Sequence, residues 1–236
     1  MKLVINHLTR ARQGYMCVGG VDVDTLQHVR PVLKSDLLPT RLLARYRGPF
    51  DMANLVDLGA TTATPTAPHI EDYIFKESRA KLQGMLDPCA FWTLLTKISR
   101  TTLQSIFGSE LRHLGGGAYG TSKNEGAASL GCLVPAEKPV LCVREKSGKP
   151  QIRMKFADGT IKADARVTDI RLYAADHVTP EAERVAKLRT RIVASECVIM
   201  SVGLTREWAS SPDREPVHWL QVNNLHLKEN PVWQLG

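Results

Sequence analysis

The first 32 residues constrain the fold more than any other part of this 236-residue chain. They hold three short apolar segments, at residues 3–5, 15–18 and 21–29, separated by a polar, basic bend and by the pair Gly19 and Gly20. Short segments rich in Val and Ile between turn residues are typical of antiparallel strands. The beginning of the chain therefore predicts several adjacent strands and a β-rich fold.

Strand patterns return in the second half of the chain. Apolar and polar residues alternate over residues 140–144 and 152–156, and Asp158 followed by Gly159 indicates a tight turn. The final segment, 218–227, predicts a strand pair or one strand with a bend at Asn223 and Asn224. Further strands are expected at residues 52–58, 73–75, 166–173 and 197–203.

Three segments have features typical of helices. The longest covers residues 78–107, and Pro88 divides it, with Asp87 either ending one helix or capping the next. A shorter helix is expected over 35–47, and residues 179–181 (TPE) predict the beginning of a helix that runs to about residue 191. No sequence repeat is visible, but β-rich and helical stretches alternate, a rhythm found in small β-barrels interrupted by a helix.

The charge balance favours a phosphate-rich partner. The chain has 31 Lys and Arg against 24 Asp and Glu, a formal net charge of +7. Basic side chains that contact a phosphate backbone release condensed counterions, which stabilises the complex. We therefore expect nucleic acid as the partner, against the alternative of a basic protein with no such ligand.

The cysteines and the hydropathy favour a cytoplasmic protein. The five cysteines are scattered and odd in number, and no C-x-x-C pair occurs, so we favour free thiols over disulfides or a zinc site. No apolar run approaches the roughly 20 residues of a membrane helix, and no secretory signal is visible. The sequence leaves the oligomeric state open.

The glycine-rich segment 114–131 is the most unusual loop. Glycine allows a backbone to approach a ligand closely and to expose its N–H groups. The segment matches neither G-x-x-x-x-G-K-[ST] nor G-x-G-x-x-G after a strand, so it does not predict a nucleotide triphosphate site. We expect either a flexible loop over a binding face or a plain surface linker.

Short blocks along the chain resemble one family, the small prokaryotic proteins described as dual-OB-fold proteins. The resemblance implies two OB-like β-barrels, a role in binding nucleic acid or nucleotides, and a frequent setting among genes of bacterial conflict with viruses. The fold class expected is then α+β and β-rich, with one OB-like domain over 1–135, a helical insert at about 78–108, and a second OB-like domain over 136–236. The blocks are residues 17–20 (CVGG) with Asp22, 29–32 (VRPV), Asp57 with 68–73 (PHIEDY), 129–131 (SLG), 169–171 (DIR), 203–206 (GLTR) and 218–223 (HWLQVN).

Several kinds of chemistry are disfavoured by absent motifs. The chain has no H-x-E with C-x-x-C for a zinc deaminase, no phosphate cradle for a kinase or helicase, and no G-x-S-x-G elbow for a hydrolase. A DNA glycosylase requires no such sequence motif. It needs a basic face, a pocket for an extruded base and one carboxylate, without metal or cofactor. We therefore predict excision of a base, modified in viral DNA, that leaves an abasic site.

The candidate site residues cluster near the beginning of the chain. Asp22 and Asp24, two residues apart, would share one strand face and supply the catalytic carboxylate, with His28 nearby. Alternatively, the two acids begin a β-turn. The residues expected to bind DNA are Arg10, Arg12, Arg30, Arg41, Arg45, Lys123 and Arg206, and those expected to stack on or read a base are Tyr15, Tyr119 and Asn223.

Each of these assignments has a purely structural alternative. Arg41 and Arg45 could lie on a solvated face, and Tyr15, Tyr119, Trp92 and Trp208 could each belong to the core. The rival functions are non-catalytic binding of single-stranded DNA or RNA, sensing of a nucleotide, and metal-dependent cleavage.

Overall fold

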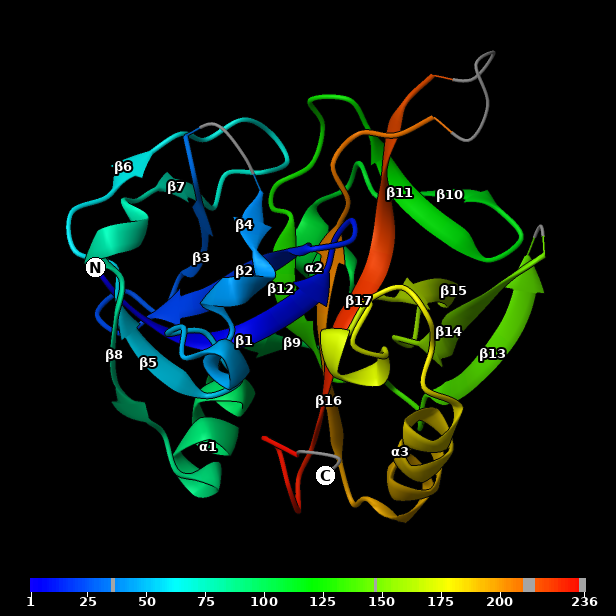
Figure 1. Cartoon of the computed structure of the whole chain (residues 1–236). Helices are drawn as coiled ribbons and strands as arrows, with labels where there is room; N and C mark the ends of the chain where they lie inside the picture. Colours follow the sequence, from blue (N-terminus) through cyan, green and yellow to red (C-terminus); the bar gives the residue numbers. More distant parts are fainter. Residues whose placement is uncertain (35–36, 147, 210–214, 234–236) are drawn as a thin grey trace.

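The computed structural model describes residues 1–34, 37–146, 148–209 and 215–233. These residues form two mainly antiparallel sheets that lie side by side, with short helices at their edges and ends (Figure 1). The predicted α+β, β-rich class is confirmed. Within the described ranges, no helix is both long enough and apolar enough to cross a bilayer.

The first sheet is built from the N-terminal part of the chain. Its strand order is β6-β7-β3-β2-β1-β5-β8, and β4 pairs with the far end of β2. Residues of β1 are buried on both faces, because one face packs into the first core and the other meets the second sheet. The strands are β1 (Lys2–Arg10), β2 (Tyr15–Asp22), β3 (His28–Val32), β4 (Leu38–Pro39), β5 (Asn54–Asp57), β6 (Thr62–Ala63), β7 (Asp72–Ile74) and β8 (Lys81–Met85).

The second sheet has the order β13-β14-β15-β17-β16-β12-β9, and the β10–β11 hairpin joins it along β17. Its longest strand, β17, pairs with β16 along most of its length and carries the last part of the second core. The strands are β9 (Ser99–Arg100), β10 (Arg112–Gly115), β11 (Ala118–Ser122), β12 (Leu130–Leu133), β13 (Val140–Lys146), β14 (Lys149–Ala157), β15 (Lys162–Val167), β16 (Val198–Leu204) and β17 (Val217–Leu227).

The helices are few and short. In α1 (Pro88–Ile98), Pro88 occupies the first turn and the Asp87 carboxylate accepts hydrogen bonds from the backbone N–H of Cys89 and Ala90, both at 3.0 Å. Asp87 is therefore the cap of the following helix, one of the two predicted roles. The other helices are α2 (Gln104–Phe107), α3 (Ala182–Ala194) and the 3-10 turns η1 (Thr40–Leu42), η2 (Ala44–Tyr46), η3 (Glu77–Arg79) and η4 (Ile170–Leu172).

Two helix predictions are corrected by the structure. Residues 37–47 form β4 and two 3-10 turns rather than a helix, since the chain pairs with β2 there, and residues 35–36 lie outside the described part. In the segment 78–107 no α-helix precedes Pro88, because Lys81–Met85 adds a strand to the edge of β5. The C-terminal helix begins later than predicted: Glu181 precedes it, and the Thr179 hydroxyl donates to Asp176.

The strand predicted over 166–173 ends at Val167. Residues beyond it turn into η4, because the Asp169 side chain accepts from the backbone N–H and the guanidinium of Arg171. Strands β9 to β12 belong to the second sheet, so sheet membership changes between Met85 and Ser99, upstream of residue 135. The division of the chain into domains at residue 135 stays a prediction.

Candidate nucleic-acid interface

The two sheets meet where β1 crosses β17 (Figure 1). The Asn224 side chain replaces a backbone partner there: its Oδ1 accepts from the Leu8 N–H at 2.7 Å, and its Nδ2 donates to the Leu8 carbonyl at 3.1 Å. Each strand carries a bulge beside this contact, at Asn6 in β1 and at Asn223 in β17. A bulge redirects side chains locally, so two polar amides point into the junction.

A cavity of about 470 Å³ opens at this junction and is lined by both sheets. The first sheet contributes His7 and Arg30, and the second contributes Arg206, Gln221 and Asn223. Among the described residues, His7 Nε2 and Asn223 Oδ1 are buried without a hydrogen-bond partner. Buried polar atoms normally have partners, so the cavity wall offers hydrogen-bonding capacity to a ligand.

A second hollow of about 690 Å³ shares Arg10, Ala11, Thr205 and Gln221 with this cavity. We call the two together the junction groove. At its outer end lie Trp208, which is 59% exposed, and Trp219, with ring centroids 6.3 Å apart. An exposed tryptophan beside a second one at a groove is the kind of surface on which bases stack.

Arginines line the groove between the tryptophans and the inner cavity. Arg10 donates from Nη1 to the His177 carbonyl at 2.9 Å and lies over the Tyr173 ring, and burial lowers its pKa. Within the described chain, the Nε atoms of Arg10 and Arg166 have no hydrogen-bond partner. Arg153 is paired with Asp164 at 2.9 Å. Arg10 and Arg166, for which no ion pair is found among the described residues, therefore supply positive charge along this part of the groove.

Beside the inner cavity, a charged network connects the two sheets and consists of Glu71, Asp72, Arg30 and Arg206. Arg30 is 4% exposed, lies 3.3 Å from Asp72 and 3.9 Å from Glu71, and contacts Ser129. Glu71 accepts from the backbone N–H of Ser129 at 2.7 Å, and Arg206 contacts Asp72 at 2.5 Å. Arg30 and Arg206 thus line the cavity, but their charges are compensated by carboxylates.

His69 completes this buried network. Its Nδ1 accepts from Arg30 Nη1 at 2.9 Å, and its ring meets that of His218 edge to face at a centroid distance of 5.0 Å. Burial, assisted by the positive charge of Arg30, lowers the pKa of His69 to about 2. The ring is therefore neutral at ordinary pH, which allows it to accept the arginine hydrogen bond.

The structure places the predicted carboxylates away from the junction groove. Strand β2 ends at Asp22, so Asp24 lies in the following turn, and the expectation that the two acids share one strand face is wrong. Asp22 Oδ1 accepts from the backbone N–H of Asp24 at 3.1 Å and of Thr25 at 2.9 Å. Asp22 thus forms the turn that was the alternative interpretation, and Asp24 is exposed.

Asp22 and His28 line a separate cavity of about 620 Å³, which we call the side cavity. His28 begins β3, and its Nε2 lies 3.9 Å from Cys132 Sγ and 3.4 Å from Asn6 Nδ2. Burial lowers the pKa of His28 to about 4. The side cavity therefore brings together one predicted acid and the predicted histidine.

The remaining predicted residues lie outside the lining of the junction groove, paired with protein groups. Arg41 donates to both carboxylate oxygens of Glu77, and Lys123 lies 3.0 Å from Glu207. The other predicted residues make contacts within the protein. Arg12 lies over the Tyr15 ring, and Arg45 lies over the Tyr46 ring and contacts His177. The Tyr119 ring packs against that of His113. Of the predicted set, Arg10, Arg30, Arg206 and Asn223 gather in the groove.

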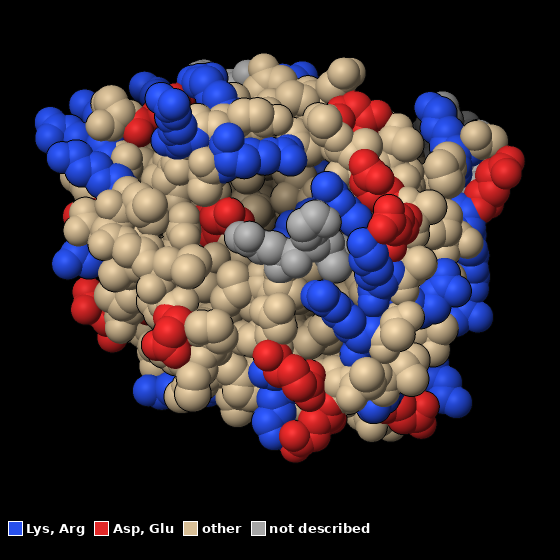
Figure 2. Space-filling model, turned by 60° about the horizontal axis from the view of Figure 1, so that its bottom comes forward, with Lys and Arg blue, Asp and Glu red and all other residues tan. Residues whose placement is uncertain are grey.

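Sequence reasoning missed Trp219, Arg166 and Gln221 as groove residues. They come from β15 and β17, which pair in parallel although they are distant in the sequence. Figure 2 shows Lys and Arg side chains in several separate groups on the face that it presents, with Asp and Glu side chains between them. On this face the basic side chains are thus dispersed among acidic ones rather than gathered into one patch.

The fold and the groove define a β-rich protein with two small sheets joined at a polar junction, next to which lie exposed aromatic rings and arginines. The chain belongs to the family described as the dual OB-containing domain, which matches residues 1–225. The OB fold is a partly open β-barrel that binds oligonucleotides or oligosaccharides, which agrees with a nucleic-acid-binding type of fold. No curated protein matches the sequence.

Proposed function

We propose that the protein binds single-stranded DNA along the junction groove. The observation that carries this proposal is the exposed Trp208 beside Trp219, next to Arg10 and Arg166, at the mouth of a groove that continues to a polar inner cavity. Sequence-tolerant binders combine such stacking rings with cations that follow the backbone.

Each part of the groove has a distinct task in this proposal. Bases stack on the two tryptophans, and the positive charges of Arg10 and Arg166 attract the phosphates. One base then enters the inner cavity, where the Asn223 amide meets its edge. One atom of this amide contacts His7, so the other is the one that can hydrogen-bond the base. A cavity of about 470 Å³ lies within the size range of small-ligand sites.

Fluorescence anisotropy with labelled single-stranded DNA tests the proposal. Each stacked base contributes roughly 1–3 kcal/mol, so Trp208→Ala should weaken binding by about 5- to 150-fold. Trp208→Phe keeps a ring and should retain most of the affinity. Tyr46→Ala removes another exposed ring (50% against 59% for Trp208) outside the groove lining and serves as the control. Unchanged affinity in Trp208→Ala would contradict the groove assignment, and parallel titrations with RNA and duplex DNA rank the ligands.

Base excision is the second candidate, favoured by the presence of Asp22 and His28 in one cavity. The test is incubation of DNA from several viruses with the protein, followed by alkali, which breaks strands only at abasic sites. Asp22→Asn keeps the oxygen that accepts the turn hydrogen bonds but loses the charge, so lost excision with retained stability would support a catalytic Asp22. Asp24→Asn is the matched comparison. Strand cleavage that needs magnesium would indicate a nuclease instead. The antiviral setting stays a prediction.

A further inference from the structure

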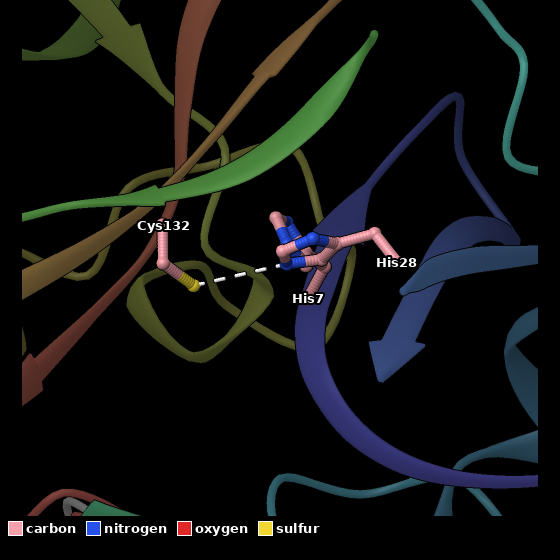
Figure 3. A group of neighbouring side chains, drawn as sticks. All are labelled: His7, His28 and Cys132. Atoms are coloured by element: carbon pink, nitrogen blue, oxygen red, sulfur yellow. Dashed lines mark hydrogen bonds between the residues drawn. The ribbon is translucent and has the colours of Figure 1, made fainter. Parts of the chain in front are cut away.

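Two imidazoles and one thiol meet where the two sheets face each other. His7 lies in β1, His28 in β3 and Cys132 in β12, and their ligand-type atoms all lie within 4.8 Å of one another. Figure 3 shows the Cys132 side chain directed from its strand toward the two histidine rings, which stand edge to face with a centroid distance of 5.3 Å. Three strands from two sheets thus converge on one point.

The cluster of His7, His28 and Cys132 contains no carboxylate, and polar side chains surround it. Cys132 Sγ lies 3.9 Å from His28 Nε2, 3.3 Å from Asn6 Nδ2 and 3.7 Å from Ser201 Oγ. Cys132 and His7 are each 1% exposed, whereas His28 is half-buried and reaches the side cavity. Water and small ions therefore have a path to the cluster from one side.

Unpartnered polar atoms surround the same point. In the described part of the chain, His7 Nε2, Asn6 Oδ1 and Asn223 Oδ1 are buried and make no hydrogen bond. Asn223 Nδ2 lies 2.9 Å from His7 Nδ1. A half-turn of this amide, whose O and N positions are assigned from the hydrogen-bond network, lets Asn223 Oδ1 accept from His7 Nδ1–H. Asn223 Oδ1 then has a partner, and the lone pair of His7 Nε2 becomes available to a ligand.

We propose that His7 Nε2, His28 Nε2 and Cys132 Sγ bind one zinc ion, with the fourth position taken by Asn6 Oδ1 or by a water from the side cavity. A half-turn of the Asn6 amide would bring its oxygen to the present place of Nδ2, 3.3 Å from the sulfur and 3.4 Å from His28 Nε2. The Asn223 amide acts as the outer partner that orients a ligand histidine.

The donor set selects the metal. Thiolate and imidazole ligands in a tetrahedral arrangement are typical of zinc, whereas calcium and magnesium require several oxygens. Metal–ligand distances of roughly 2.0–2.3 Å place tetrahedral ligand atoms roughly 3.3–3.8 Å apart. The present spacing, at most 4.8 Å, therefore has to contract by about 1 Å. On coordination the thiol proton leaves to solvent, and the S–H bond is replaced by an S–Zn bond.

Zinc at this point would join β1 and β3 of the first sheet to β12 of the second. The cluster lies on the wall between the two cavities, because His7 lines the junction groove while His28 and Cys132 line the side cavity. The ion would therefore stabilise the junction that shapes the groove. This role is independent of whether nucleic acid binds there.

Cobalt substitution tests the site. Tag-free protein, stripped with a chelator, is titrated with Co²⁺, and the near-ultraviolet thiolate-to-cobalt charge-transfer band is measured. We expect saturation at one equivalent, loss of the band on addition of one equivalent of Zn²⁺, and a higher melting temperature with zinc. Cys132→Ser should abolish the band, and Cys142→Ser, which changes a thiol outside the cluster, should leave it unchanged.

A second variant controls for the possibility that Cys132→Ser loses the band because it misfolds. His28→Gln removes a half-buried ligand and should weaken cobalt binding at least tenfold while the far-ultraviolet circular dichroism remains that of the parent. The proposal is overturned if the parent protein shows no charge-transfer band at equimolar cobalt, or if the band persists in Cys132→Ser. Neither readout depends on nucleic acid, so failure of the zinc site and failure of the groove are separately visible.

Discussion

Asn224→Ala is the sharpest test of how the two sheets are held together. The Asn224 amide satisfies both the N–H and the carbonyl of Leu8, and all these groups are buried. An unsatisfied buried backbone group costs roughly 1–3 kcal/mol, so two of them cost about 2–6 kcal/mol. Because the alanine variant no longer buries an amide of its own, we expect a net loss of about 2–4 kcal/mol in the free energy of unfolding.

Urea denaturation followed by tryptophan fluorescence measures this loss. Asn230→Ala is the matched control, since Asn230 is exposed and should change stability by less than about 0.5 kcal/mol. Asn224→Asp is a second comparison, because a carboxylate oxygen next to the Leu8 carbonyl repels it, and the buried charge should destabilise at least as much as alanine. A loss below about 0.5 kcal/mol in Asn224→Ala would refute the idea that this side chain substitutes for a strand partner.

Three further predictions concern a turn, the base cavity and the groove charge. Asp158 accepts from the Leu103 N–H and from its own turn, which depresses its pKa, so its stabilisation is present above the unfolded pKa and is lost as the pH falls through the folded one. Asp158→Asn should therefore cost about 1–3 kcal/mol at pH 7. The difference from the parent in thermal unfolding should shrink as acid protonates the Asp158 carboxylate, and a difference that stays constant in acid would contradict this. Gly203→Ala places a Cβ 2.6 Å from Asn223 Nδ2 and should reduce oligonucleotide affinity in anisotropy titrations, whereas unchanged affinity would remove Asn223 from the base cavity. Arg166→Gln should lower the slope of log affinity against log salt by about 0.7 for single strands, and an unchanged slope would exclude a phosphate contact.

Local patterns were sufficient where neighbouring residues decide the structure. Asp87 followed by Pro88 predicts a helix boundary, and α1 begins there because the carboxylate caps its first backbone N–H groups. The alternation over 140–156 predicts the β13–β14 hairpin, since one face of each strand packs into the core. The overall α+β, β-rich class follows from the same short-range information.

Local patterns failed where long-range pairing overrides propensity. The leucines of residues 37–43 have helical spacing, but Leu38 pairs with Met16 in β2, so the chain is extended there. Lys81–Met85 was expected in a helix, but it completes the edge of β5. Backbone hydrogen bonds to a distant strand satisfy more groups at these positions than an isolated helical turn would.

By itself, the sequence determined the β-rich class, a helix boundary at Asp87, the basic character and the resemblance to dual-OB-fold proteins. Only the tertiary structure decided which side chains share a site. Trp219 and Arg166 line one hollow because β15 and β17 pair in parallel, and Cys132 meets His7 and His28 because two sheets face each other. The physical reason is that the spacing of residues predicts only which side chains share a face of one strand or helix. Contacts between two sheets depend on burial and on bulges, which no local pattern encodes.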